Sequence, residues 1–494
     1  MWNKESLHKL IQSKLSNYNL IVVANREPYI HQHVDDEIEC RRPASGMASA
    51  LDPIMRACGG TWVGHGGGDA DRETVDERDR VRVPPEDPNY TLRRVWLSKK
   101  EEEGYYHGLS NEGLWPLCHV VFTRPVFELK HWEMYKKVNK KFADAVIEEA
   151  GDVPTFVFIQ DYHFALMPRM LKQMNPNLVV AQFWHIPWPN RETFQAFPWK
   201  EELLDGLLGN DLLGFHLRYH CQNFLDTVDR GIEAMVNQEQ SEVTRGGKTT
   251  LVRPFPISID FESHVLRAQS AAVDDKIRKF HRYFKSGKRL IGVGIERIDY
   301  TKGIPERLRA VDRLLEKHPE YVDKFIFIQV GVPSRGHIDA YKKIDDEIDR
   351  IVEEVNWKWG TDNWKPIHYA KRHFSTEEMM ALHRMAHFFV VSSLHDGMNL
   401  VSKEYVASRF DGDGMLILSS FAGASRELSD AILVNPFSID ELADAIRQAI
   451  ETPEEERRKR MQKLRAAVAE NNIYRWAGKI ISALLKFDFP EESM

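Results

Sequence analysis

The sequence predicts an α/β protein in which helices flank parallel sheets, and three observations lead to this fold class. Short runs of β-branched and aromatic residues alternate with longer amphipathic stretches along most of the chain. Several of these runs are apolar at successive positions, as in strands that helices cover on both faces. The 494 residues suffice for two to four domains of about 100–200 residues, each with a sizeable core.

The expected strands, in chain order, cover residues 20–24, 156–160, 179–183, 290–295, 325–330, 388–392, 415–419 and 431–434. Helical patterns lie between them, which favours strand–helix–strand units. Residues 252–260 contain two prolines after a polar, glycine-containing stretch, a pattern typical of a domain boundary. We therefore expect one domain over residues 1–255 and a second over residues 256–475.

Composition and charge exclude several classes of protein. A hydrophobic fraction of 43% and a charged fraction of 29% are ordinary for a soluble globular chain. The net charge of −7 argues against a general nucleic-acid or membrane-surface binder. The N-terminal residues carry charges throughout, unlike a targeting signal, and no apolar run approaches the ~18 residues of a membrane span. Because four widely spaced cysteines favour reduced thiols, we expect a cytoplasmic protein.

The functional residues are expected at the ends of the strands, because ligands of open parallel sheets bind beyond the carboxyl ends. Six of the expected strands are followed by polar residues, in segments 25–26, 161–163, 184–185, 296–303, 331–336 and 394–400. Each segment alone could be a solvated loop. Together they supply arginine and aspartate side chains, which indicates a cleft that binds an anionic, polar ligand.

Two pairs of cations could bind the anionic part of such a ligand. Arg297 and Lys302 share one glycine-containing strand-to-helix loop, where two fixed cations could neutralise a diphosphate without a metal. Residues 399–407 predict the start of a helix, whose free N–H groups and dipole favour a phosphate. Arg26 and Arg335 form a possible second anion clamp. The alternative for each arginine is a surface ion pair.

Four small or aromatic residues have two interpretations each. Ser45 and Gly46 precede an apolar helix pattern, so their loop either approaches a sugar or phosphate closely or forms an ordinary turn. Trp62 and Trp115 lie in loop contexts, where they are either aromatic walls for a sugar ring or buried anchors.

Motifs of other enzyme classes are incomplete. The HGGG run at 65–68 resembles the oxyanion loop of esterases, but the chain has no GxSxG nucleophile motif. The Asp-x-Asp patterns at 69–71 and 411–413 follow no expected strand end, and the histidines have no metal-ligand spacing. We therefore expect neither a metal nor a cofactor.

Taken together, these motifs make the chain resemble the trehalose-6-phosphate synthases, retaining sugar-nucleotide glucosyltransferases with two facing Rossmann-like domains around a cleft, the GT-B architecture. The resemblance is carried by VVANR, LWPL, QDYHF, HIPWP, LLGFH, ERIDYTKGIPERL, PSRG, DGMNLVSKEYVASR and SSFAGASREL. It implies that residues 1–255, with the C-terminal helix 476–494 packed back on them, form the acceptor-binding domain. Residues 256–475 would then bind the nucleotide sugar.

The resemblance also implies roles for individual residues. The catalytic set is His185, Arg297, Lys302 and Asp396. The donor-binding set is Ser45, Gly46, Arg297, Lys302, Phe374, Asp396, Gly397, Met398, Asn399, Leu400, Val401, Ser402, Lys403 and Glu404. The acceptor-binding set is Arg26, Trp62, Tyr106, Trp115, Asp161 and Arg335.

On the donor side, Arg297 and Lys302 would bind the diphosphate, which residues 400–403 would cap at the helix start. Glu404 would hold the ribose, and Phe374 would contact the base. Two departures from the family pattern occur near these positions: Ser45 stands where a glycine is usual, and His395 stands where an arginine is usual. Neither removes a charge that the chemistry needs.

Asp396 and His185 would contact the transferred glucose, and Arg26, Tyr106 and Arg335 would bind the acceptor phosphate. Asp161, Trp62 and Trp115 would shape the acceptor sugar pocket. HIPWP at 185–189 replaces the commoner HIPFP of the family.

The implied reaction transfers glucose, with retention, from a nucleoside diphosphate glucose to glucose 6-phosphate and gives α,α-trehalose 6-phosphate. UDP-glucose is the first choice of donor, with ADP- and GDP-glucose left open. The alternatives are a glucosylglycerol-phosphate synthase, which uses glycerol 3-phosphate, and a catalytically silent sugar-phosphate sensor. We expect a homo-oligomer, a dimer or tetramer, whose partners are these small molecules and include no nucleic acid and no membrane.

Overall fold

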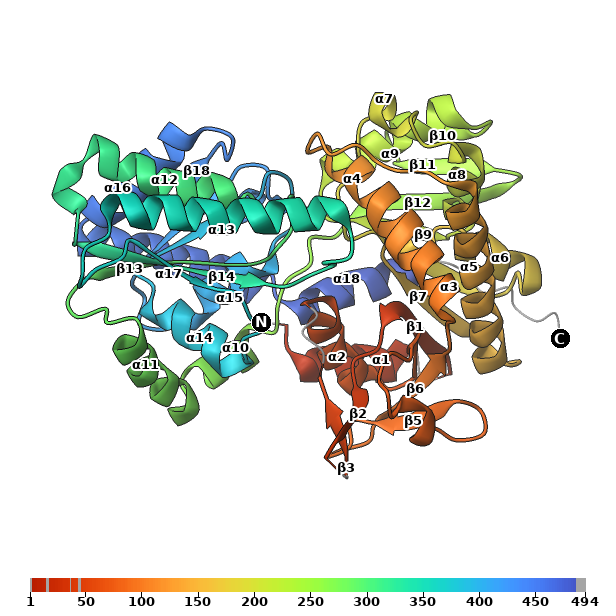
Figure 1. Cartoon of the computed structure of the whole chain (residues 1–494). Coiled ribbons are helices and arrows are strands. Elements are labelled where there is room, and N and C mark those ends of the chain that lie inside the picture. Colours follow the sequence, from red (N-terminus) through yellow and green to blue (C-terminus); the bar gives the residue numbers. More distant parts are fainter. Residues whose placement is uncertain (1, 15–16, 36, 43–45, 486–494) are drawn as a thin grey trace. The chain divides into compact units, whose positions relative to one another are not determined.

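The computed structural model describes residues 2–14, 17–35, 37–42 and 46–485, apart from the side chains of residues 46 and 49. These residues form two compact units (Figure 1). The N-terminal unit runs from Trp2 to Ile257 and includes the last helix, α18 (Ile473–Leu484), whereas the C-terminal unit runs from Ser258 to Asn472. No helix in the described ranges is long and apolar enough to cross a membrane.

The N-terminal unit is built on a ten-stranded sheet in the order β10-β11-β12-β9-β8-β7-β1-β4-β6-β5. The parallel strands are β1 (Asn19–Arg26), β4 (Thr61–His65), β6 (Tyr90–Val95), β7 (Thr155–Gln160), β8 (Val179–Phe183), β9 (Leu212–Phe215) and β12 (Lys248–Pro254). Antiparallel strands extend both edges: β5 (Arg80–Val83), β10 (Met235–Asn237) and β11 (Glu242–Arg245). Strands β2 (Ile30–Val34) and β3 (Glu37–Arg41) pair separately as a hairpin.

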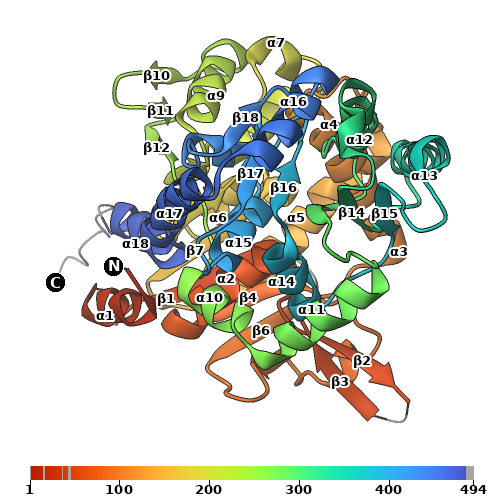
Figure 2. The ribbon, with the colours of Figure 1, turned by 90° about the vertical axis from the view of Figure 1, so that its left-hand side faces the viewer.

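Helices cover both faces of this sheet. On one side α5 (Leu129–Ala150) contacts β1, β4 and β6, and on the other α18 packs Trp476 against Phe158 and Phe183 (Figures 1 and 2). The other helices are α1 (Lys4–Lys14), α2 (Gly46–Cys58), α3 (Lys99–Glu102), α4 (Trp115–His119), α6 (Met167–Met174), α7 (Arg191–Phe194), α8 (Lys200–Leu207) and α9 (Arg218–Gly231). A π-helical segment (Glu103–Leu114) joins α3 to α4, and short 3₁₀ turns cover Asp71–Glu73 and Tyr162–Phe164.

The C-terminal unit is a six-stranded, all-parallel sheet in the order β15-β14-β13-β16-β17-β18. Its strands are β13 (Leu290–Arg297), β14 (Phe325–Val332), β15 (Ile367–Ala370), β16 (Phe388–Val391), β17 (Met415–Ser419) and β18 (Ile432–Val434). β13, β14, β16 and β17 are buried along nearly their whole length, as the continuous apolar runs predict.

The helices of the C-terminal unit form two layers. One face carries α12 (Ile304–Lys317), α13 (Asp339–Trp359) and α16 (Ile439–Glu451) (Figures 1 and 2). The other carries α10 (Phe261–Ala268), α14 (Thr376–Met385), α15 (Leu400–Ser408) and α17 (Glu454–Glu470), with α11 (Ala271–Tyr283) packed on α14. Short 3₁₀ turns cover Pro319–Tyr321 and Gly423–Arg426. The predicted α/β class, with two Rossmann-like units and helix-flanked parallel sheets, is confirmed.

Strand order locates the binding edge of each sheet. Taken in chain order, the C-terminal strands lie as 3-2-1-4-5-6, so the direction of winding reverses between β13 and β16. The parallel strands of the N-terminal sheet follow the same order from β6 to β9, and there the reversal lies between β1 and β7. Ligands of doubly wound sheets bind outside the carboxyl ends of the strands at such a reversal. The loops after β13, β16, β1 and β7 are therefore the places to examine.

Candidate functional site

The loop after β13 carries the first two predicted cations. Arg297 is the last residue of β13, two residues beyond the predicted strand end, and Lys302 lies in the turn that follows. Gly303 has a φ of +60°, and a Cβ there would lie 2.0 Å from the carbonyl oxygen of Ser392, so only glycine lets the loop approach the end of β16 this closely. The fully buried Arg307 donates to Ser392 Oγ at 2.8 Å and to the Lys302 carbonyl at 3.0 Å, which ties the loop to β16.

Lys302 meets Asp396 across the strand-order reversal. Lys302 Nζ lies 2.5 Å from Asp396 Oδ2, and the lysine is only 7% exposed. Ser393 Oγ and Asn399 Nδ2 donate to the same carboxylate oxygen at 3.3 Å. Burial alone would lower the pKa of Lys302, but the charges of Asp396 and Glu296 hold it above its usual value. The lysine is therefore charged where it meets Asp396 at the sheet edge.

A second loop braces the turn that holds Asp396. The Gly423 N–H donates to the Asp396 carbonyl at 3.1 Å, and the Ala424 N–H donates to the Met398 carbonyl at 2.8 Å. A Cβ on Gly423 would lie 2.0 Å from the carbonyl oxygen of Gly397, so the close approach requires glycine. The SSFAGASREL motif after β17 thus fixes the backbone of residues 396–398.

The start of α15 is capped from within. Asn399, at φ +82°, accepts the Ser402 N–H through Oδ1 at 3.0 Å. Lys403 Nζ reaches Glu427 Oε2 at 2.5 Å, and its side chain is 1% exposed, so it lies in the interior. An anion at this helix start would therefore meet the backbone N–H groups of residues 400–401 and the positive end of the helix dipole.

Glu404 lies one turn after Leu400, the first residue of α15. Burial, aided by the nearby charge of Glu296, raises the pKa of Glu404 to about 7. Phe374 follows β15 at the same edge of the sheet, with the Arg372 guanidinium 3.7 Å from its ring centroid and the Phe280 ring 6.1 Å away. Its ring is therefore packed on more than one side.

Arg335, predicted on the acceptor side, lies in the C-terminal unit beside a buried carboxylate. Its Nη1 donates to Tyr341 Oη at 2.5 Å and lies 3.9 Å from Asp299 Oδ2. Burial would raise the pKa of Asp299, yet the charges of Arg297, Arg335 and Lys302 hold it below its usual value. Three cations thus lie close enough to Asp299 to act on its charge.

In the N-terminal unit, Arg26 and Tyr106 are brought together as predicted partners. Arg26 ends β1, is exposed, and donates from Nη2 to Tyr106 Oη at 3.1 Å. The Tyr106 ring stacks on His163, with centroids 5.7 Å apart and planes 16° from parallel. The stacked ring places the phenol hydroxyl beside the guanidinium at the end of β1.

The predicted loop contexts of the two tryptophans are wrong. Trp62 lies inside strand β4 with no exposed surface, and its Nε1 donates to the Arg26 carbonyl at 3.2 Å. Trp115 begins α4 and is 6% exposed, with its ring 4.1 Å from His119 and 6.0 Å from Tyr162. Both are anchors of this unit, and Trp62 supports the backbone that carries Arg26.

Asp161 and His185 connect the ends of β7 and β8. Asp161, in the left-handed region at φ +71°, accepts the Tyr162 N–H at 2.9 Å and the His185 N–H at 3.2 Å through Oδ1. His185 Nε2 lies 2.9 Å from Gln160 Oε1. Burial lowers the pKa of His185 to about 3, so its ring is neutral at physiological pH.

A buried ionic cluster, missed by the sequence analysis, lies under the HGGG loop. Glu27 accepts the Gly67 N–H at 2.9 Å, and Asp71 accepts the Gly68 N–H at 2.6 Å. Arg94, with no exposed surface, donates to Glu27 at 2.8 Å and lies 2.7 Å from Asp71. Burial, with the hydrogen bond and charge of Asp71, raises the pKa of Glu27 to about 8 despite Arg94.

This cluster predicts a pH-dependent stability. Because the folded pKa of Glu27 exceeds the ordinary value of 4.5, the folded state binds the extra proton between about pH 4.5 and 8, and stability falls as pH rises through this window. Thermal unfolding should show the wild type on the order of 1–2 kcal/mol less stable at pH 8 than at pH 6. Glu27→Gln, which cannot ionise beside Asp71, Arg94 and His31, should flatten that slope. An identical slope in both proteins would contradict the assignment.

The structure therefore groups the predicted residues by unit. One group adjoins β13, β15 and β16: Arg297, Lys302, Phe374, Asp396, Gly397, Met398, Asn399, Leu400, Val401, Ser402, Lys403 and Glu404, with Arg335 beside it. The other adjoins β1, β7 and β8: Arg26, Trp62, Tyr106, Trp115, Asp161 and His185. Gly46 begins α2, and Ser45 lies outside the described residues.

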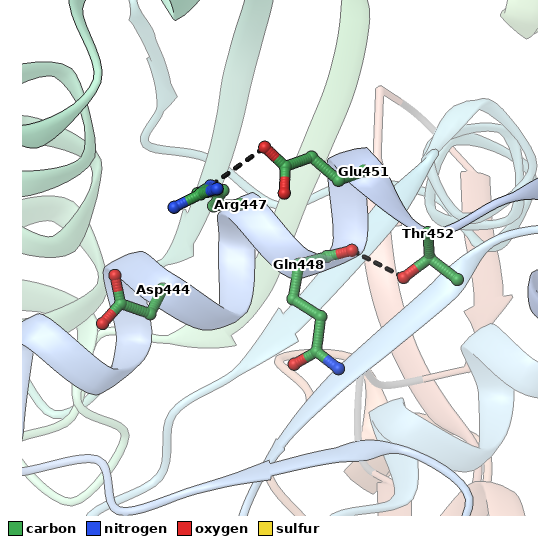
Figure 3. A pocket seen from close by; sticks show the side chains of 5 residues that line it. All are labelled: Asp444, Arg447, Gln448, Glu451 and Thr452. Atoms are coloured by element: carbon green, nitrogen blue, oxygen red, sulfur yellow. Dashed lines mark hydrogen bonds and ion pairs between the residues drawn. The ribbon is translucent and has the colours of Figure 1, made fainter.

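Other candidate features carry none of these residues. A surface hollow in the C-terminal unit is lined by Asp444, Arg447, Gln448, Glu451 and Thr452, on and just after α16 (Figure 3). Among the described residues, no group of three or more His, Cys, Asp or Glu side chains is arranged to hold a metal ion.

The fold and the cation-rich edge of the C-terminal sheet are those of a glycosyltransferase. The chain matches the model of glycosyltransferase family 20 over residues 18–486 and belongs to that family. The resemblance to the trehalose-6-phosphate synthases is confirmed. A trehalose-6-phosphate synthase of Mycolicibacterium vanbaalenii is 37% identical over 481 residues, which span 96% of this chain and 97% of that protein.

Two solved structures are similar over nearly the whole chain. An E. coli protein of this group, bound with UDP-2-fluoro glucose, matches with a TM-score of 0.85 and 31% identity over 95% of this chain and 99% of its own. An α,α-trehalose-phosphate synthase (UDP-forming) from Burkholderia xenovorans, in complex with glucose-6-phosphate, matches with a TM-score of 0.84 and 27% identity over 94% and 100%.

Proposed function

We propose that this glycosyltransferase is a trehalose-6-phosphate synthase that transfers glucose from UDP-glucose to glucose 6-phosphate with retention. The observation that carries the proposal is a cluster of cations at the edge of the C-terminal sheet: Arg335 lies 3.9 Å from Asp299, Lys302 is paired with Asp396, and the charges of Arg297, Arg335 and Lys302 all lower the pKa of Asp299. Asp396 is paired with Lys302, so three cations face two carboxylates and leave a net positive charge that favours a diphosphate and a phosphate. The ligands named for the E. coli and Burkholderia xenovorans proteins support this choice.

On the donor side, Arg297, Lys302 and the start of α15 bind the diphosphate and stabilise the charge that develops as it leaves. Asp396 accepts a hydroxyl of the transferred glucose, and Glu404 binds the ribose. Fixed cations supply this stabilisation from the chain's own side chains, so the proposal requires no metal and no cofactor.

On the acceptor side, Arg26, Tyr106 and Arg335 bind the phosphate, and Asp161 orients the sugar. Trp62 acts indirectly, since it holds the Arg26 carbonyl. His185, with its low pKa, serves the transferred glucose as a neutral hydrogen-bond partner rather than as a charge.

The proposed step needs no protein nucleophile. An acceptor hydroxyl oxygen bonds to the anomeric carbon on the face that the diphosphate leaves, as the bond from that carbon to the diphosphate oxygen breaks. The hydroxyl proton passes to the departing phosphate oxygen. The products are α,α-trehalose 6-phosphate and UDP, and the cations act by stabilising the leaving group.

Donor binding should depend on pH through Glu404. With a pKa of about 7, Glu404 is largely protonated at pH 6 and ionised at pH 8, and a carboxylate binds hydroxyl donors more strongly than its acid does. The donor KM should therefore rise several-fold as pH falls from 8 to 6, in proportion to the lost charge-assisted bonds. Glu404→Gln should show a raised donor KM with little pH dependence. A wild-type KM that is constant over this range would contradict the role.

The test of the function measures nucleoside diphosphate release from UDP-, ADP- and GDP-glucose, each with glucose 6-phosphate or glycerol 3-phosphate. Rapid release only with UDP-glucose and glucose 6-phosphate supports the proposal. Release with another base corrects the donor, and release with glycerol 3-phosphate favours the glucosylglycerol-phosphate synthase. Binding without turnover would favour a sensor. Sedimentation of the same preparation tests the expected homo-oligomer.

A further inference from the structure

Asp299 is a buried carboxylate whose two oxygens face different parts of the site. It has no exposed surface. Oδ1 accepts the Thr301 N–H at 3.0 Å and the Thr301 hydroxyl at 2.9 Å, and the Asp299 carbonyl accepts the Lys302 N–H at 3.0 Å. This oxygen therefore shapes the turn that presents Lys302.

The other oxygen reaches Arg335 through a phenol. Tyr341 Oη donates to Asp299 Oδ2 at 3.2 Å and accepts from Arg335 Nη1 at 2.5 Å. Tyr341 is 1% exposed, and its ring packs edge-on against Tyr300 with centroids 5.2 Å apart. The Tyr341 hydroxyl is thus fixed by the core, and it aims an arginine whose own backbone is in the left-handed region at φ +47°.

We propose that Tyr341 and Asp299 are positioning residues for the acceptor phosphate: Asp299 fixes the Tyr341 hydroxyl, which holds Arg335 beside the loop of Lys302. This inference rests on the proposed function, because it takes Arg335 as a ligand of the acceptor phosphate. Recognition of the acceptor phosphate then depends on Tyr341, a residue that touches no substrate. The long guanidinium side chain would otherwise lose conformational entropy on binding, and a prepositioned one loses less.

The test compares Tyr341→Phe with the wild type in steady-state transfer from UDP-glucose to glucose 6-phosphate. Phenylalanine keeps the ring packing and removes only the hydroxyl. The KM for glucose 6-phosphate should rise about tenfold, the effect of one lost hydrogen bond to a charged group, while the KM for UDP-glucose changes less than twofold. Asp299→Asn, which removes the charge and leaves one acceptor oxygen where two are used, should raise both KM values. Tyr321→Phe, which removes a hydroxyl bonded to Glu451 in the same unit, is the matched control and should change neither.

A double-mutant cycle with Arg335→Ala separates positioning from general damage. If Tyr341 acts through Arg335, the Tyr341→Phe change should add less than a twofold further rise in the KM for glucose 6-phosphate when Arg335 is already absent. An equal rise in both backgrounds, or a rise shared by both substrates in Tyr341→Phe, would overturn the inference. A wild type that transfers no glucose to glucose 6-phosphate would instead defeat the proposed function on which it rests.

Discussion

Arg297→Ala should lower the rate of nucleoside diphosphate release by about 10²–10³, the typical cost of removing one preorganised group that stabilises developing negative charge. Arg297 ends β13 at the strand-order reversal, where it lies close enough to Asp299 to depress the pKa of that carboxyl. Removal of the Arg297 side chain should leave the fold intact, because the buried residues of β13 are 291–296 and Arg297 is not among them. Steady-state assays with saturating donor and acceptor would measure the effect.

The matched control is Arg289→Ala, at the residue just before the opposite end of the same strand. Arg289 is paired with Asp323 and lies at the end of the sheet away from the predicted ligands, so its loss should leave turnover within twofold of the wild type. Near-normal turnover in Arg297→Ala, with thermal unfolding unchanged, would refute the assignment of a leaving-group cation.

Lys302→Met should reduce both stability and turnover, and a second substitution should separate the two effects. The single change removes the ammonium that lies 2.5 Å from the nearly buried Asp396 carboxylate. Breaking such a pair lowers the free energy of unfolding by about 3–5 kcal/mol. Replacing both partners, as Lys302→Met with Asp396→Asn, removes the unpaired charge and should recover most of the free energy of unfolding in a denaturant titration.

The turnover rate of the double variant should not recover along with its free energy of unfolding. Because Lys302 also faces the proposed diphosphate, the double variant should stay at least about 10² below the wild type in rate. Recovery of turnover to within tenfold of the wild type would show that Lys302 serves only to neutralise Asp396.

The strands that could be predicted from the sequence are those that consist of continuous runs of apolar residues. Residues 179–183 and 415–419 form β8 and β17 with the predicted bounds, because unbroken apolar runs have few alternatives in a soluble chain. Strand β4 was missed because TWVGH stands among glycines and resembles a loop. The antiparallel strands β10 and β11 were missed because they are short, polar and partly exposed, so no apolar run marks them.

The residue pattern alone indicated the candidate site at the ends of strands, and it led to Arg26, Asp161 and Arg297, because strand ends meet at one edge of a sheet. The roles of Asp396, Phe374 and Glu404 rested on the resemblance to the family, and all these roles stay predictions. Asp299 lay within a noted motif, and an acidic residue between two cations was a usable signal. Tyr341 could not have been found, since it reaches the site from α13 and only the folded packing brings it to Asp299.

The bond between Lys302 and Asp396 has a consequence for which anions the site rejects. A ligand that engages only Lys302, such as free phosphate or pyrophosphate, must draw the ammonium away from a carboxylate 2.5 Å distant and leave that carboxylate with only the neutral donors Ser393 and Asn399. In the proposed reaction, a nucleotide sugar would offer a diphosphate to the lysine and a sugar hydroxyl to the aspartate, so both former partners would be satisfied together. The ion pair would then select against small anions such as free phosphate, because it favours ligands that carry both groups.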